Sequence, residues 1–199
     1  MIKVLISIAA VMLFGSVASA NLVINGGFET GDSTGWTVTY SQASLDFING
    51  PGGIPTVQVQ NGNWVPPYEG SWSVVFGGPD FDTISQSIAT APGTTYKLSF
   101  WVNDEGNTPA TLIAKWNDAP VTTLDWGNTT STWTQYNANV VGTGSDTLAF
   151  SAYGFNWWTS LDSVALTAAP SPEPVTMTLV GMGIAGLGSY LRRRARAKA

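Results

Sequence analysis

Short runs of alternating hydrophobic and polar residues, separated by turn residues, fill the chain between residues 21 and 167 and constrain its fold most strongly. The clearest run is 95–102, where the hydrophobic side chains are Tyr96, Leu98, Phe100 and Val102. This period of two is typical of a β-strand with one face on a core. No convincing amphipathic helix interrupts these runs, so the sequence predicts an all-β fold.

Eight strands are predicted in this part of the chain: 22–24, 71–76, 83–88, 95–102, 111–116, 133–140, 147–152 and 161–166. Eight antiparallel strands match a jelly-roll β-sandwich, and a domain of about 150 residues can bury one core. Trp36 and Trp72 are predicted in that core. The Gly-, Pro- and Asn-rich residues 46–67 are predicted as a long surface insertion that carries a short hairpin at 56–60.

The composition excludes several classes of function. The chain has neither Cys nor His, which excludes disulfides, Cys or His nucleophile systems and the ordinary zinc sites. Between residues 21 and 169, two lysines stand against twelve carboxylates, a net charge of −10. Because such a domain repels phosphate, nucleic acid is not an expected partner.

Residues 1–20 have the organisation of a secretory signal peptide. Lys3 precedes an apolar run at 4–14, and Ala18-Ser19-Ala20 forms a small-residue cleavage site. The apolar run is shorter than the ~20 residues that a membrane span needs, which disfavours the alternative of an uncleaved anchor. The sequence predicts export, with a mature protein that begins at Asn21.

The other end, residues 170–199, has three parts. They are Pro172-Glu173-Pro174, the uncharged residues 175–191, and a basic tail at 192–199 that begins with Arg192, Arg193 and Arg194. Residues 175–191 predict one transmembrane helix, slightly short for a ~30 Å hydrocarbon core. The positive-inside rule places the basic tail in the cytoplasm.

This order of parts resembles the PEP-CTERM sorting signal of Gram-negative bacteria, over about residues 172–196. The resemblance implies recognition by an exosortase, a membrane transpeptidase that cleaves near Pro172-Glu173-Pro174. The protein would then be anchored transiently in the inner membrane before it reaches the cell surface or the exopolysaccharide matrix. A plain permanent membrane anchor is the alternative.

The domain between the two ends, residues 21–169, resembles galactose-binding-like jelly rolls. The motifs that carry the resemblance are Asn25-Gly26-Gly27-Phe28-Glu29, Gly35-Trp36, and the runs 68–74, 84–88, 92–100 and 161–166. The superfamily includes carbohydrate-binding modules, so the resemblance implies this fold and leaves the ligand open.

A structural calcium ion is one expected cofactor. Glu29 near the first strand and Asp162 in the last can lie side by side in a jelly roll, and main-chain carbonyls can complete a calcium site. In the resembling modules a carboxylate of each motif helps to hold such an ion. Ser163 stands where a second acidic residue is usual, which puts one ligand in doubt. In the alternative, both carboxylates cap turns or face solvent.

Glycan binding is the second hypothesis, because aromatic rings stack on sugar rings while amide side chains bind hydroxyls. The candidate ligand-binding residues lie on a polar strand face, at strand ends or in loops: Trp101, Tyr153, Trp157, Trp158, Trp64 and Trp126. The alternative for each is ordinary packing in or on the sheets.

Hydrolysis by paired carboxylates is the third hypothesis. The local pairs are Asp80 with Asp82 and Asp104 with Glu105, and both lie in turn-like sequence without a recognisable catalytic context. The sequence therefore predicts a non-enzymatic, glycan-binding protein of the cell surface or matrix. The alternative is a structural matrix or biofilm protein that acts through protein–protein association without recognising sugar.

Overall fold

The structure is a computed structural model that describes residues 20–51, 53–63, 65–104, 110–126, 132–154, 158–170 and 183, with the side chain of Trp126 left out. The chain divides into two compact units, Met1–Ala168 and Ala169–Ala199. Except for Ala20 and Gly183, the predicted signal peptide, sorting motif, membrane span and basic tail lie outside the described residues. None of the helices in the described part is long and apolar enough to cross a membrane.

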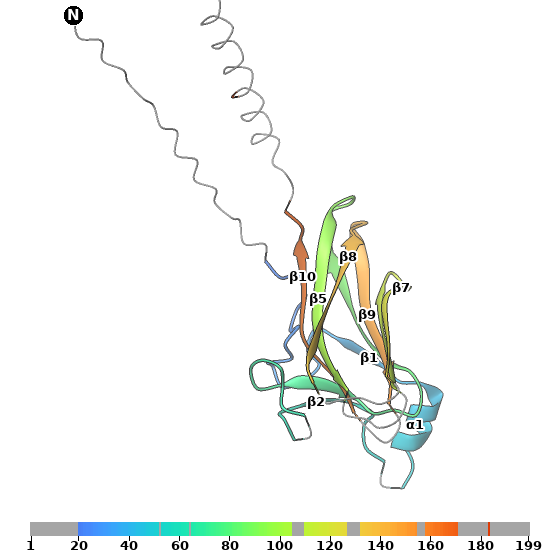
Figure 1. The fold of residues 1–199 in the computed structure, drawn as a ribbon. Helices are drawn as coiled ribbons and strands as arrows, with labels where there is room; N and C mark the ends of the chain where they lie inside the picture. Colours follow the sequence, from blue (N-terminus) through green and yellow to red (C-terminus); the bar gives the residue numbers. More distant parts are fainter. Residues whose placement is uncertain are drawn as a thin grey trace, which may run out of the picture. The chain divides into compact units, whose positions relative to one another are not determined.

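The first unit is all-β, as predicted, with two five-stranded antiparallel sheets that enclose one core (Figure 1). The first sheet has the order β1(Thr37–Thr39), β4(Asp82–Ala89), β9(Ser145–Tyr153), β6(Ala110–Trp116), β7(Ala119–Trp126). The second has the order β2(Val57–Gln60), β3(Ser73–Phe76), β10(Thr159–Ala168), β5(Thr95–Asp104), β8(Thr134–Val141). We call them the β4–β9 sheet and the β5–β10 sheet.

The described residues form ten strands, so the prediction of eight was wrong. Seven predicted strands are present, but residues 22–24 form none: Leu22 only donates its main-chain N–H to the carbonyl of Leu166, at 2.9 Å. The three strands beyond those seven are β1, β2 and β7. With three residues, β1 is too short to show a period of two.

Strand β7 was not predicted, because the turn that separates it from β6 has only two residues. Asn117 and Asp118 both have positive φ, 50° and 64°, as a type I′ hairpin turn requires, and Asn and Asp tolerate this conformation. Pro120 lies within β7, and because β7 is an edge strand its missing N–H is tolerated.

The predicted surface insertion is more regular than expected. A short helix, α1(Gln42–Ile48), enters it, and the Ser41 side chain caps the helix by accepting the Ser44 N–H at 3.1 Å. Seven residues are fewer than two helical turns, too few for a periodic signal. Instead of forming a separate hairpin, β2 pairs with β3.

The core lies between the sheets, and the alternation of 95–102 predicted its side correctly. Leu98 and Phe100 are fully buried, and Tyr96 and Val102 nearly so. Trp36 is buried as predicted and stacks on Phe28 with ring centroids 5.8 Å apart. Trp72 is only half-buried, at the margin of the core.

Candidate functional site

The Asn25–Glu29 motif forms a turn that lies on the closing strand β10. Val164 donates its main-chain N–H to the Gly26 carbonyl at 2.9 Å. The Glu29 carboxylate accepts the main-chain N–H groups of Ser71 and Trp72 at 2.9 and 3.0 Å. Glu29 therefore binds a segment about forty residues further along the chain.

Asp162 binds the same segment. Its Oδ2 accepts the main-chain N–H groups of Tyr68 and Glu69 at 2.9 and 3.1 Å. A β-bulge follows Asp162 in β10, and Ser163 in it has φ 49°. Glu29 and Asp162, the carboxylate pair, thus hold the segment 68–72 through four of its main-chain amides.

Gly70 is required for this arrangement. It has φ +70°, and a Cβ atom there would lie 2.3 Å from an oxygen of the Glu29 carboxylate. Any other residue would push the carboxylate away from the amides of the segment. The glycine of the Tyr68-Glu69-Gly70-Ser71-Trp72 motif thus leaves room for the Glu29 carboxylate.

The environment of Asp162 disfavours its ionised form. The pKa of Asp162 is raised to about 6: burial is the largest cause, the main-chain amides oppose it in part, and the nearby Glu29 carboxylate adds to the rise. A cation bound next to the two carboxylates would offset their negative charge and so stabilise the ionised form of Asp162.

A hollow of about 480 Å³ lies beside the carboxylate pair. Its walls include Asn21, Gly27, Glu29, Glu69 and Ser163. Within the described part of the chain, no three His, Cys, Asp or Glu side chains group as metal ligands. The two carboxylates fit calcium in charge and oxygen chemistry, and the other ligands would be main-chain oxygens and water. Their bonds to main-chain amides equally fit the turn-capping alternative.

Next to the carboxylate pair, three aromatic side chains meet on the outer face of the β5–β10 sheet. Asp162 lies opposite Trp101 in the register of β10 and β5. Tyr68 stacks on Trp101 with ring centroids 3.7 Å apart and planes 15° apart. Trp133 meets Tyr68 edge-on at 6.1 Å and donates its indole N–H to the Pro66 carbonyl at 3.0 Å. We call Tyr68, Trp101 and Trp133 the aromatic platform.

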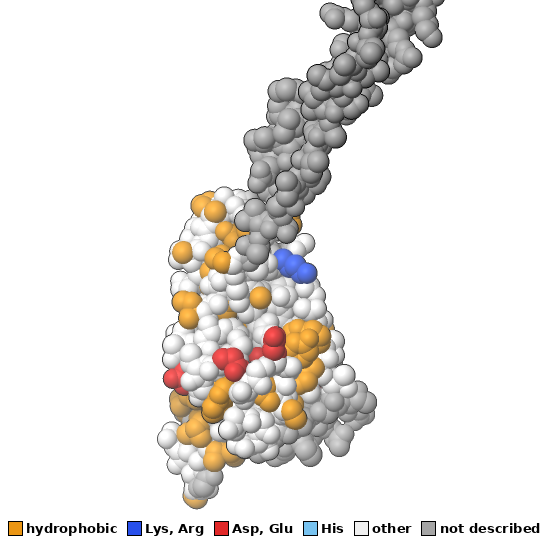
Figure 2. Space-filling view, turned by 90° about the vertical axis from the view of Figure 1, so that its left-hand side faces the viewer, with side chains coloured by type: hydrophobic (Ala, Val, Ile, Leu, Met, Phe, Trp, Pro, Cys, Tyr) orange, Lys and Arg blue, Asp and Glu red, His pale blue; other side chains and the backbone are white. Residues whose placement is uncertain are grey.

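The platform has an exposed ring. Tyr68 keeps 40% of its surface exposed, whereas Trp101 and Trp133 are half-buried. In Figure 2, acidic side chains gather near the middle of one face, beside a patch of hydrophobic side chains. Sequence reasoning found Trp101 and missed Tyr68 and Trp133, because only the path of the segment 68–72 brings these rings together.

The other predicted ligand-binding residues do not join this platform. Tyr153 lies at the end of β9 in the other sheet, edge-on to Phe81 with ring centroids 4.9 Å apart. Trp158 is half-buried. Its ring packs so close to Gly77 that a Cβ atom on Gly77 would lie 2.6 Å from it. Trp126 lies in β7, but its side chain is outside the described structure, as are Trp64 and Trp157.

Three of the four carboxylates considered for hydrolysis bind neighbouring groups of the fold. Asp82 is buried and accepts the Ser41 N–H and the Thr56 hydroxyl, at 2.8 and 2.5 Å. Asp80 accepts the N–H of the next residue at 2.7 Å. In the second pair, Asp104 is buried and accepts the Thr159 hydroxyl at 3.2 Å, while Glu105 lies outside the described residues.

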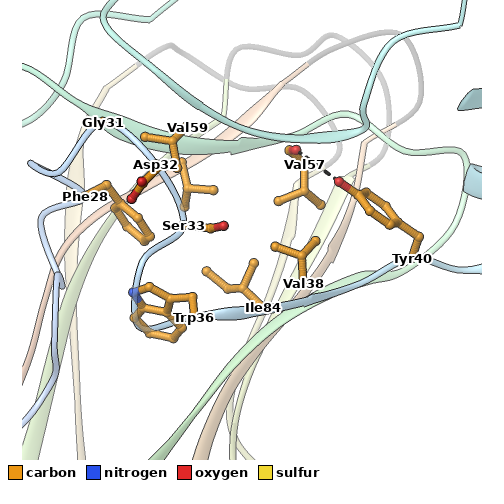
Figure 3. A pocket seen from close by; sticks show the side chains of 11 residues that line it. Phe28, Gly31, Asp32, Ser33, Trp36, Val38, Tyr40, Val57, Val59 and Ile84 are labelled. Atoms are coloured by element: carbon orange, nitrogen blue, oxygen red, sulfur yellow. Dashed lines mark hydrogen bonds between the residues drawn. The ribbon is translucent and has the colours of Figure 1, made fainter.

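A smaller cavity of about 170 Å³ opens between the edge strands β1 and β2 (Figure 3). Val38 and Tyr40 face Val57 and Val59 across it, and the Tyr40 hydroxyl donates to the Val57 carbonyl at 3.5 Å. Its walls are mostly apolar, with Asp32 and Ser33 contributing polar groups. This cavity is an extension of the core and lacks facing catalytic groups.

No family model and no curated protein matches the chain. Solved structures do. TmCBM61, solved with β-1,4-galactotriose, has a TM-score of 0.56 at 22% identity and covers 76% of this chain and 100% of its own. The CBM22-1 xylan-binding domain of Paenibacillus barcinonensis Xyn10C has a TM-score of 0.53 at 17% identity and covers 79% of this chain and 99% of its own. A cyclase from Fischerella sp. TAU has a TM-score of 0.54 at 16% identity and covers 77% of this chain and 99% of its own.

At these identities the similarity establishes the fold. The neighbours include carbohydrate-binding modules, in agreement with the jelly-roll fold predicted for residues 21–169, and they also include an enzyme. Function therefore depends on the chain's own residues. The chain is a jelly-roll-like β-sandwich of the kind found in carbohydrate-binding modules.

Proposed function

We propose that this protein is an exported, non-catalytic glycan-binding protein whose sugar site is the aromatic platform. The observation that carries the proposal is the stack of Tyr68 on Trp101, in which Tyr68 keeps 40% of its surface exposed. Aromatic rings of this kind bind the apolar faces of sugar rings. The glycan-binding modules among the similar folds support the proposal.

The carboxylate pair prepares this site. By binding the amides of the segment 68–72, Glu29 and Asp162 hold Tyr68 over Trp101 before any ligand arrives. A bound calcium ion would neutralise the two carboxylates and make the segment more rigid. Preorganisation of this kind lowers the entropic cost of binding.

The proposal includes the route that the terminal sequences imply. The signal peptide at 1–20 would direct export, and an exosortase would cleave near Pro172-Glu173-Pro174, releasing the protein from the inner membrane to the surface or matrix. Mass spectrometry of matrix-associated protein tests this step. A mature carboxyl terminus that still contains Arg192–Arg194 would contradict it.

Affinity electrophoresis of the purified protein tests glycan binding. The gels contain the producing organism's own exopolysaccharide, xylan or β-1,4-galactan, with an acidic polymer as a comparison. We expect retardation by a neutral polymer, and we expect Tyr68→Ala and Trp101→Ala to abolish it. Tyr153→Ala is the matched control because it removes an aromatic ring from the other sheet. Absence of retardation in every gel would contradict the proposal and favour protein–protein assembly in the matrix.

A further inference from the structure

Strand β8 presents a row of carboxamides on the same outer face as the aromatic platform. Gln135, Asn137 and Asn139 alternate with the inward-facing residues of β8 and are all exposed. None of the three side chains hydrogen-bonds to another described residue. The row therefore offers donors and acceptors that the fold does not use.

The fold does not require this composition. Asn is depleted in strands, yet two of the eight residues of β8 are Asn. Edge strands usually carry charges that prevent pairing with other chains, but β8 is an edge strand without a charged residue. A local rule broken without a structural gain is a mark of a functional surface.

The row continues directly from the aromatic platform. Gln135 lies opposite Trp101 in the register of β5 and β8, and Trp133 is two residues before it. The next outward positions pair Asn137 with Ser99 and Asn139 with Lys97. Successive amides on one face of a strand are about 6.8 Å apart, so platform and row form a straight track more than one sugar ring long.

Charge selects the polymer for this track. The carboxylates of Glu29, Glu69 and Asp162 lie near its aromatic end, and the domain carries a net charge of −10 between residues 21 and 169. One lysine, Lys97, stands on the track. A polyanion would be repelled, whereas hydroxyl groups match carboxamides in both donors and acceptors.

We propose that a linear, uncharged polysaccharide lies lengthwise along β8, with one sugar ring on Tyr68 and the following rings hydrogen-bonded to Gln135, Asn137 and Asn139. This inference rests on the proposed function and extends it, because it assigns a direction and a polymer class. The site binds internal stretches of a chain, and its affinity rises with the length of the oligosaccharide.

Calorimetric titration with β-1,4-galactan and xylan oligosaccharides of increasing length tests the track. The double variant Asn137→Ala/Asn139→Ala should lose about tenfold in affinity for the long oligosaccharides, equivalent to ~1.4 kcal/mol, and retain affinity for the shortest one bound. The matched control is Thr37→Ala/Thr39→Ala, which removes two exposed side chains at the same spacing from the other sheet. Thermal unfolding verifies that both variants fold.

The possible outcomes separate the two proposals. An unchanged length dependence in the double variant overturns the track and leaves glycan binding at the platform intact. Equal affinity for an acidic oligosaccharide such as oligogalacturonate overturns the uncharged polymer class. If the wild-type protein binds none of these probes, the track is overturned, and the gel with the producing organism's own exopolysaccharide then decides glycan binding at the platform.

Discussion

Two buried aspartates of this fold, Asp146 and Asp162, have pKa values shifted in opposite directions. Burial raises the pKa of Asp146, but hydrogen bonds from Thr90, Asn117 and Thr143 outweigh it, so the pKa lies well below its usual range. For Asp162 the balance reverses: burial is the largest effect and outweighs the main-chain amides that lower the pKa, and the nearby Glu29 carboxylate raises the pKa further.

The two residues also differ in what they connect. Asp146 binds groups from three turns: those before β5, between β6 and β7, and before β9. Its charge thus stabilises the fold. Asp162 connects the closing strand to the segment that carries Tyr68. A carboxylate at a position where its charge is unfavourable is a candidate site residue.

The largest effect is expected from Asp146→Ala. It removes the charged acceptor of the Thr90 hydroxyl, the Asn117 amide and the Thr143 N–H, so three partly buried hydrogen bonds to a carboxylate are lost. We expect a loss of about 3 kcal/mol in the free energy of unfolding, measured by urea titration. Ser145→Ala, at the exposed neighbouring position, serves as the control. A loss below about 1 kcal/mol would contradict the role of Asp146 as the link between the turns.

Calcium is expected to act on the other aspartate. If the carboxylate pair holds the ion, calcium at about one hundred times its dissociation constant adds about 2.7 kcal/mol of stability. Thermal unfolding in calcium and in a chelator measures the difference. Glu29→Gln should remove it while keeping an oxygen for the Ser71 and Trp72 amides. Identical unfolding temperatures in both conditions would leave the carboxylates as turn caps alone.

In the presence of a chelator, the stability of the fold should change with pH in opposite directions for the two aspartates. The pKa of Asp162, about 6, exceeds its ordinary value of 3.8, so the folded state binds the proton more tightly and stability rises as the pH falls from above 6 to about 4. With water screening at the hollow, we expect a gain of about 1 to 2 kcal/mol. The pKa of Asp146 is lowered, so its stabilisation is present above 3.8 and is lost below.

Melting temperatures between pH 3 and pH 8 measure both changes. Asp162→Asn should flatten the rise between pH 6 and pH 4 and leave the loss at lower pH unchanged. A fall in stability through the same interval in the wild-type protein would contradict the environment assigned to Asp162.

Individual elements show how far the sequence predicts this protein. The strand at 95–102 and its buried face were predicted correctly, because alternation is local and burial follows from it. The motifs around Glu29 and Asp162 were paired correctly as neighbours. Strand β7 was missed because its signal lies in the φ angles of Asn117 and Asp118 rather than in a hydrophobic period.

The sequence by itself determined an all-β domain, the positions of seven strands and, for the strand at 95–102, the side that faces the core, because these depend on neighbours along the chain. Tertiary structure alone decided which aromatic rings meet. Tyr68 reaches Trp101 because two distant carboxylates bind the amides around it, and Tyr153 lies in the other sheet because β9 pairs with β4 and β6. Such contacts join residues far apart in sequence, and no local pattern encodes them.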